Sequence, residues 1–228
     1  MDLVSTLAFE TVFRGDPPPR DGPYLLGQAI GFVKGHWLGY LPDRAYWPAE
    51  LDDRNTVDRR TLFEIGARAD DELGAVHTLV ATYVWTTGTK WRKASQLGSV
   101  FDSNPGLVGA NLSLAVRTAR TEGAVDGYAL LTRRGTHPLA RLGMAEAGRV
   151  LHFGAYDKTG PLILDQHVTV GVNALRGTDW SPDGPWSAEQ YGDYLGYAAE
   201  WAQRWAPGTS TDLVERTLAA AGQALGRA

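Results

Sequence analysis

Leu139-Ala-Arg-Leu-Gly143 opens the stretch that decides the fold of this 228-residue chain, which continues as Met-Ala-Glu-Ala-Gly-Arg-Val-Leu-His-Phe-Gly154 and, after a loop, as Pro161-Leu-Ile-Leu-Asp-Gln-His-Val168. The pattern predicts a tight turn around Gly143 and two helices, over 145–155 and 164–175. Asp165 lies at the start of the second helix, where a carboxylate most often caps free backbone N–H groups. A turn between helices also exposes N–H groups at a helix N-terminus, a favourable position for a phosphate.

Helical patterns extend on both sides of this stretch. Apolar residues recur at helical spacing after Asp70 and Asp71, and this helix is expected to end at Gly88. Other helices are expected after a Thr56 N-cap, after Asn104-Pro105, over 125–133, from the Ser187–Gln190 capping box to about Trp205, and over 210–225. Strand patterns are weak, so the chain is predicted to be mainly α, with roughly eight helices.

The first 55 residues differ in composition from the rest. They are rich in aromatic residues and proline, and Pro17-Pro-Pro19 would stop any helix that begins near Leu3. We expect an N-terminal segment, 1–55, with one short helix at most, packed on a helical domain that covers 56–228.

Composition excludes several kinds of chemistry. The chain has no cysteine, which rules out disulfides, thiol catalysis and cysteine-ligated zinc, and its five histidines lack paired metal-ligand spacing. No apolar run approaches the ~20 residues that a membrane span needs. We therefore expect a cytoplasmic monomer without metal or cofactor. The net charge of −4 argues against nucleic-acid binding by bulk attraction, although a local basic surface can still bind phosphates.

The central stretch resembles the helix-hairpin-helix superfamily of DNA glycosylases, and most closely the compact bacterial proteins similar to 8-oxoguanine DNA glycosylase. In that group a Leu-Gly turn leads into a helix with a Thr-Lys pair and Leu-x-Phe, and a Leu-Ile-Leu-Asp-x-x-Val segment carries the catalytic acid. Leu142-Gly143, Leu151-His-Phe153 and Leu162-Ile-Leu-Asp165 with Val168 match these motifs. The resemblance implies a helical domain of two lobes with a cleft between them.

Shorter likenesses carry the resemblance over residues 56–218. No single one is decisive, but their order and spacing agree with the family. They lie at 83–88, 128–131, 190–195, 201–202 and 214–215.

The chain departs from the family at Gly148-Arg149, where the family has its Thr-Lys pair. In bifunctional members this lysine attacks the sugar C1′ and forms a Schiff base, which allows strand cleavage. Arginine cannot do so, because its guanidinium stays protonated. The resemblance therefore implies a monofunctional DNA N-glycosylase that hydrolyses the bond to a damaged or modified base, such as one like 8-oxoguanine. Lys158 is an alternative amine, although a solvated loop lysine is the simpler interpretation.

The resemblance also assigns roles to individual residues. Asp165 would be the catalytic acid, and Arg149 a phosphate or electrostatic contact beside it. DNA contacts are expected from Gly143, Ala145, Arg141, Lys158, Lys90 and Arg92. The base pocket is expected from Trp85, His152, Phe153, Tyr191 and Gln190, with Trp37 and Tyr194 as further aromatic candidates. Each aromatic residue is more often part of a core than a base contact.

Two other functions stay open on the sequence. One is a nucleic-acid-binding relative without catalysis, which the acidic charge and the missing lysine favour. The other is an enzyme that acts on free nucleosides, or a helical protein with no nucleic-acid role. Substitution of Asp165 separates an enzyme from a binder, and DNA binding that weakens with salt separates both from the last class.

Overall fold

The computed structural model describes residues 7–89, 91–157 and 159–226. These residues form twelve α-helices, two 3₁₀ turns and one pair of two-residue strands, so the mainly helical prediction is confirmed. The α-helices are α1 (Phe9–Val12), α2 (Pro23–Leu26), α3 (Gly35–Leu38), α4 (Arg59–Gly66), α5 (Glu72–Thr87), α6 (Trp91–Ser103), α7 (Val108–Thr121), α8 (Ala124–Leu131), α9 (Met144–Ala155), α10 (Gln166–Arg176), α11 (Ala188–Trp205) and α12 (Thr211–Leu225). The strands are β1 (Ile30–Gly31) and β2 (Thr56–Val57), paired antiparallel, and the 3₁₀ turns are η1 (Arg44–Tyr46) and η2 (Ala49–Leu51).

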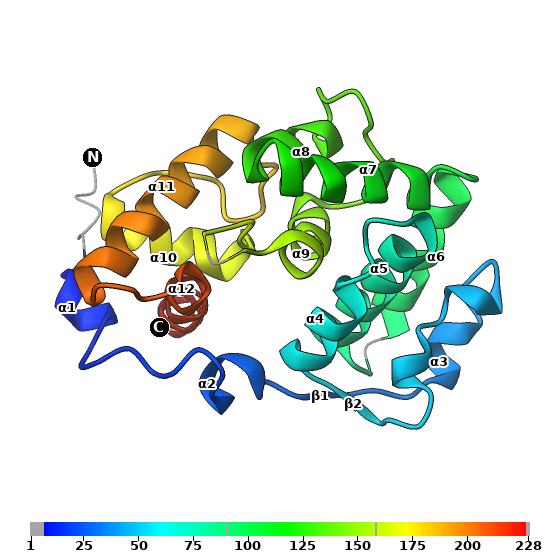
Figure 1. Ribbon diagram of the computed structural model, residues 1–228, viewed down its shortest axis with the longest axis horizontal. Coiled ribbons are helices and arrows are strands. Elements are labelled where there is room, and N and C mark those ends of the chain that lie inside the picture. The colour runs from blue at the N-terminus through cyan, green and yellow to red at the C-terminus, as the bar shows by residue number, and fades with distance from the viewer. Residues whose placement is uncertain (1–6, 90, 158, 227–228) are drawn as a thin grey trace.

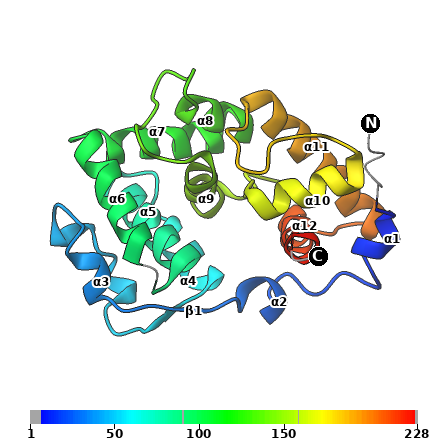
Figure 2. The same ribbon diagram turned by 180° about the vertical axis from the view of Figure 1, so that it is seen from behind.

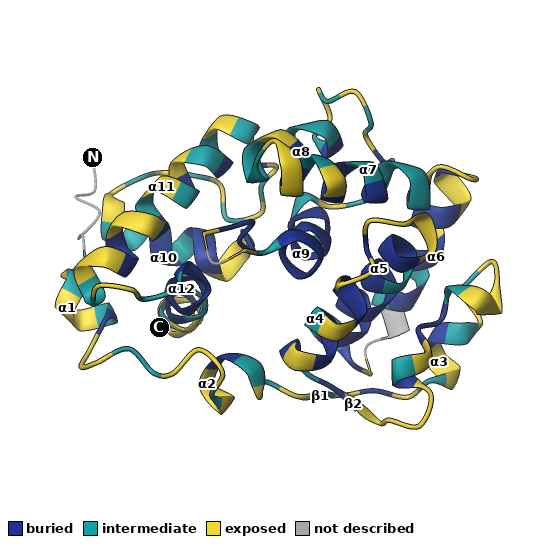
Figure 3. Cartoon of the chain, viewed as in Figure 1, coloured by how far each residue is buried: buried dark blue, intermediate teal, exposed yellow. Residues whose placement is uncertain are grey.

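Helix α9 lies in the middle of the molecule. Helices α3 to α6 lie on one side of it, and α10, α11 and α12 lie on the other (Figures 1 and 2). Most of α9 is buried, because α4, α5, α7 and α8 all pack against it (Figure 3). Gly66 makes one of these contacts possible, since a Cβ there would come within 2.3 Å of the Phe153 carbonyl oxygen. The two sides of the molecule therefore meet at the helix that carries Arg149.

Local side-chain caps fix several helix ends where the sequence predicts them. Asp71 accepts a hydrogen bond from the backbone N–H of Gly74 and begins α5, which ends at Gly88. Ser187 and Gln190 form the expected capping box at the start of α11. These ends were predictable because each cap and its partner lie within three residues.

Two predicted caps are wrong. Thr56 lies in β2, and the side chain of Asp58 caps α4 instead. Asn104 does not open α7, which begins at Val108. Its amide donates to Val100 O and Ala140 O and its oxygen accepts from Ala140 N, so it joins the end of α6 to a distant turn.

The N-terminal segment has more structure than one short helix. It runs along one side of the molecule from α1, near α12, to α3, near α6 (Figure 1). Leu25, Trp37, Trp47 and Leu51 are buried along this path. Its helices have only four residues each, which is too short for a periodic sequence pattern to reveal them.

In the part of the chain that the structure describes, every helix is too short or too polar to cross a bilayer.

Candidate active site

Asp165 is the N-cap of α10 and is held by three donors. Its Oδ1 accepts hydrogen bonds from the backbone N–H groups of His167 (3.0 Å) and Val168 (3.1 Å). Its Oδ2 accepts from Nη2 of Arg149 at 2.9 Å. The side chain is 21% exposed, so one edge of the carboxylate stays open to a neighbouring pocket. The capping interpretation and the catalytic one are therefore compatible, because the cap fixes the carboxylate without covering it.

Arg149 joins two carboxylates. Besides Asp165, its guanidinium contacts Oε1 of Glu146 at 3.4 Å, one turn earlier on α9. Lys93 of α6 approaches the same Glu146 oxygen at 3.8 Å. The arginine is nearly buried, and its Nε has no hydrogen-bond partner among the described residues. Arg149, which the resemblance places at the position of the family's lysine, thus forms an ion pair with Asp165.

The carboxylate of Asp165 borders a pocket of about 450 Å³, which we call the Asp165 pocket. Residues from both sides of the molecule line it. They are Gln28, Ile30, Trp85, Thr86, Ala145, Glu146, Arg149, Asp165, Gln166, His167, Pro182, Asp183, Trp186 and Gln223. A further hollow of about 830 Å³, lined by the turn before α9 and by Trp186, borders it and shares Ala145, Glu146 and Asp183 with it. Together they give the groove between two groups of helices that the resemblance implies.

The backbone before Asp165 is irregular, and buried side chains hold it in place. His152 Nδ1 donates to the Pro161 carbonyl at 2.8 Å. The Tyr191 hydroxyl accepts from Leu162 N at 3.0 Å and donates to Leu162 O at 2.8 Å. The Tyr194 hydroxyl donates to Ile163 O at 3.1 Å. These side chains form hydrogen bonds with buried backbone N–H and C=O groups that lie outside any helix or strand. They thereby fix the position of the backbone that leads to Asp165.

The structure brings together some of the residues predicted for the site. Arg149, Ala145 and Trp85 line the Asp165 pocket, and Gly143 and Arg141 line the adjoining hollows. Arg92 lies in α6, but its side chain, like Lys90 and Lys158, lies outside the described residues.

Four residues predicted for the base pocket lie elsewhere. His152, Phe153 and Tyr191 are buried in the core and line none of the hollows around Asp165. Gln190 is used in the capping box of α11. Trp37 and Tyr194 are core residues as well. In the observed arrangement His152 and Tyr191 hold the backbone before Asp165, and none of these side chains reaches the pocket.

Several pocket residues escaped the sequence analysis. Glu146 carries an ordinary helix-start signal, and only the fold shows that it borders three hollows. Trp186 follows Pro185 in a loop. The only sign in the sequence that it could line a pocket is that this tryptophan is not part of a periodic apolar pattern. Gln28 lies in the N-terminal segment, far from the central stretch, and its carbonyl accepts from Trp85 Nε1 at 3.1 Å.

Residues 23–219, most of the chain, match a protein family described as "Putative 8-oxoguanine DNA glycosylase OGG-like protein". The chain belongs to this family. The predicted relationship to 8-oxoguanine DNA glycosylases is thereby confirmed. The OGG-like match begins at Pro23, so it includes the part of the N-terminal segment that lines the Asp165 pocket. Searches among curated proteins and among solved structures each found no significant match.

His152 makes the stability of this OGG-like protein depend on pH. Burial, with the nearby Arg59 charge, holds the pKa of His152 well below its usual value. Below pH ~6.5 the unfolded chain binds a proton that the folded chain excludes, so stability falls as pH falls. The free energy of unfolding should drop by up to about 1.4 kcal/mol per pH unit more than in His152→Asn, whose amide can still donate to Pro161 O. Urea denaturation of both proteins at pH 7, 6 and 5 measures this difference, and parallel curves would contradict the assignment.

Arg141 has an unusual backbone conformation in the turn before α9. Its φ is +67°, and it is the non-glycine residue with positive φ in the described part of the chain. This conformation costs a side-chain-bearing residue about 1 kcal/mol. Arg141→Gly should therefore stabilise the fold by up to about 1 kcal/mol, and Arg141→Ala should not. Because the resemblance predicts a DNA contact from Arg141, we expect both substitutions to weaken DNA binding equally. Thermal unfolding and salt-dependent DNA titration measure both effects. Equal stability of the two variants would show that the turn is unstrained.

Proposed function

We propose that this protein is a monofunctional DNA N-glycosylase, which removes a damaged or modified base by hydrolysis. The observation that carries the proposal is the Asp165 carboxylate, fixed by three donors and open to a pocket lined by Trp85 and Trp186. Membership of the OGG-like family supports DNA as the substrate. A base removed from the duplex would lie in this pocket, because enzymes that act on a base must first take it out of the stack.

Asp165 would act on the sugar. As the C1′–N bond breaks, its electron pair leaves with the base and positive charge develops on the sugar ring. The fixed carboxylate stabilises that charge, and a water molecule beside it bonds to C1′. The proton that the water loses ends on the departing base, so the reaction is a balanced hydrolysis. Arg149 would keep the carboxylate in place throughout.

The two indoles suit the base. Trp85 Nε1 donates to Gln28 O, and Trp186 Nε1 donates to Ser181 O at 3.0 Å. Their polar edges are thus satisfied within the protein, which leaves ring surface at the pocket for stacking. Stacking of a base on an aromatic side chain contributes about 1–3 kcal/mol.

The monofunctional assignment depends on whether a lysine amine lies close enough to Asp165 to attack the sugar. No lysine among the described residues lines the Asp165 pocket. Lys93 comes nearest in the interaction network, but it contacts Glu146 from the neighbouring hollow. Without an amine at C1′, no Schiff base forms and the sugar–phosphate backbone stays intact.

The test uses purified protein and end-labelled duplexes that contain 8-oxoguanine, uracil, alkylated bases or no modification. Each reaction is divided and treated with or without alkali. We expect strand breaks only after alkali, on at least one modified duplex. Breaks without alkali, together with a borohydride-trapped covalent complex, would overturn the monofunctional assignment. A protein that binds these duplexes but yields no product would be a binding relative without catalysis.

A further inference from the structure

A second carboxylate, that of Glu146, lines the Asp165 pocket. Glu146 lies in the first turn of α9, three residues before Arg149, and its side chain is 15% exposed. Its Oε1 contacts Nη1 of Arg149 at 3.4 Å, and Oδ2 of Asp165 contacts Nη2 of the same guanidinium at 2.9 Å. One arginine therefore holds two carboxylates at the wall of one pocket. The reaction described above uses only Asp165.

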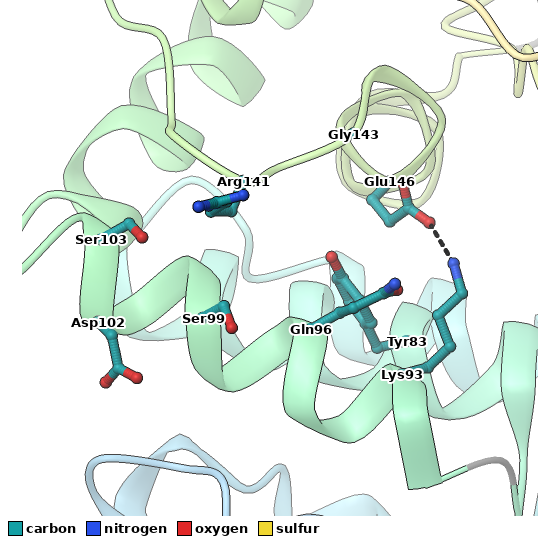
Figure 4. Close-up of a pocket in the computed structure, with 9 residues that line it drawn as sticks. All are labelled: Tyr83, Lys93, Gln96, Ser99, Asp102, Ser103, Arg141, Gly143 and Glu146. Atoms are coloured by element: carbon teal, nitrogen blue, oxygen red, sulfur yellow. Dashed lines mark ion pairs between the residues drawn. The ribbon is translucent and has the colours of Figure 1, made fainter.

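The two carboxylates differ in how closely their partners approach them. Asp165 accepts hydrogen bonds of 2.9, 3.0 and 3.1 Å, and a carboxylate has about four acceptor sites. The contacts of Glu146 are longer, at 3.4 Å to Arg149 and 3.8 Å to Lys93 of α6 (Figure 4). Both exceed the range of about 2.7–3.2 Å that is usual for an N–H···O hydrogen bond. Glu146 therefore has the greater capacity to accept a short hydrogen bond from a water molecule.

A glutamate at a helix start is favourable by itself, because a helix N-terminus carries partial positive charge. Glu72, in the first turn of α5, is such a residue: it is exposed and lines none of the hollows around Asp165. Glu146 differs, because the fold places its carboxylate between α6 and Arg149, at the pocket. Gly143 leaves room for it there, since a Cβ at that position would come within 2.4 Å of Glu146 Oε2.

Hydrolysis at a sugar C1 atom can divide its work between two carboxylates. In inverting glycosidases one of them activates the water molecule, and a separation of about 6.5–9.5 Å between the two leaves room for that water. Here the two carboxylates contact the two ends of one guanidinium, which keeps Oε1 of Glu146 and Oδ2 of Asp165 within the upper limit of that range. While Asp165 stabilises the charge on the sugar, the second carboxylate can act on the water.

We propose that Glu146 is the general base of the hydrolysis that Asp165 supports. As the water oxygen bonds to C1′, one O–H bond of the water breaks and its proton moves to a carboxylate oxygen of Glu146. The electron pair of the C1′–N bond leaves with the base, which takes up a proton from the solvent while Glu146 releases its own. Atoms and charges balance. This inference rests on the proposed function and names a second catalytic residue for it.

The first measurement is the single-turnover excision rate of Glu146→Gln, on a modified duplex that the wild-type protein cleaves. Glutamine has nearly the same size, and its amide oxygen can still accept from Arg149, but it cannot take up the proton. We expect the rate to fall about 10²–10⁴-fold, the contribution typical of a general base. Affinity for a duplex with a tetrahydrofuran nucleotide, which has no base to remove, should stay equal or increase, because a negative charge is lost.

Two further variants separate a general base from a mere counter-charge. If Glu146 only neutralised the cations beside it, Lys93→Met added to Glu146→Gln would restore the charge balance and with it the rate. We expect no such recovery. In Glu146→Ala, which leaves space at the pocket, sodium formate should raise the excision rate about tenfold or more by supplying a carboxylate, and sodium chloride at the same ionic strength should not. Recovery in the double variant, or equal rates with formate and chloride, would overturn the inference.

Glu72→Gln is the matched control, because it makes the same chemical change in the first turn of another helix. It should leave excision unaffected. The outcomes also separate the inference from the proposed function. Excision that depends on Asp165 but is unchanged in Glu146→Gln would overturn the inference alone. Duplex binding by the wild-type protein without excision of any base would overturn the proposed function, and the inference with it.

Discussion

Asp165→Asn is expected to lower the single-turnover excision rate by about 10²–10³-fold, the loss typical when a fixed electrostatic partner of the transition state is removed. The amide is neutral, so it no longer stabilises the positive charge that develops on the sugar. Duplex affinity should stay equal or increase, because the substitution removes a negative charge beside the DNA. The measurement is alkali-dependent strand cleavage under enzyme excess, on whichever modified duplex the wild-type protein cleaves.

Asparagine is the informative replacement because it preserves the helix cap. Asn caps helices about as well as Asp, so its side-chain oxygen can still accept from the N–H groups of His167 and Val168. Arg149 keeps its contact with Glu146. The fold should therefore remain intact, and near-identical thermal unfolding of the two proteins would show that the lost rate is chemical.

Asp71→Asn is the matched control. Asp71 is also an N-cap, bonded to Gly74 N at 2.7 Å, and it lines none of the hollows around Asp165. Its substitution makes the same chemical change at a helix start and should leave excision unaffected. Excision that survives Asp165→Asn would mean that another group acts as the acid, and Glu146 would be the first to examine.

The features that the sequence predicts correctly are those encoded over short distances. The caps at Asp71, Ser187 and Asp165 each depend on a partner within three residues, and the structure contains all of them. The spacing of Gly143 and Asp165 places a turn and a helix start where the structure has them. Local sequence pattern was therefore sufficient to place Asp165 at the start of a helix and to predict the succession of helices along the chain.

The features that sequence analysis missed depend on contacts between distant segments. Arg149 lies on α9 and Asp165, 16 positions later, is the N-cap of α10, so only the folded arrangement of the chain reveals their ion pair. His152 and Tyr191 were expected at the base because aromatic residues stack on bases. They contact backbone atoms up to 29 positions away instead. Hydrogen bonds of this kind leave no periodic signal in the sequence, because the partner is a main-chain group that every residue carries.

Glu215→Gln should have the largest effect on stability, because it breaks a buried ion pair between the two sides of the molecule. Arg59 of α4 contacts Glu215 of α12 through two hydrogen bonds, of 2.5 and 3.3 Å, and both residues are at most 2% exposed. Burial raises the pKa of the Glu215 carboxyl, and the Arg59 guanidinium opposes that rise. The substitution would leave the Arg59 charge buried without a counter-charge. Loss of one partner in such a pair costs about 3–5 kcal/mol, which we expect as a lower midpoint of urea denaturation.

The double variant Arg59→Met, Glu215→Leu shows whether the charge itself is responsible. It removes both charges and fills the space with apolar atoms, so most of the stability should return. Excision should not return fully, because Arg59 also lies over the Trp85 ring, at 5.3 Å from its centroid, and Trp85 lines the Asp165 pocket. A double variant as unstable as Glu215→Gln would mean that packing, and not the unpaired charge, sets the cost. A double variant with full stability and full excision would show that catalysis does not depend on the Arg59–Glu215 pair. The pair would then be needed neither to position Trp85 nor to hold the two sides of the molecule together.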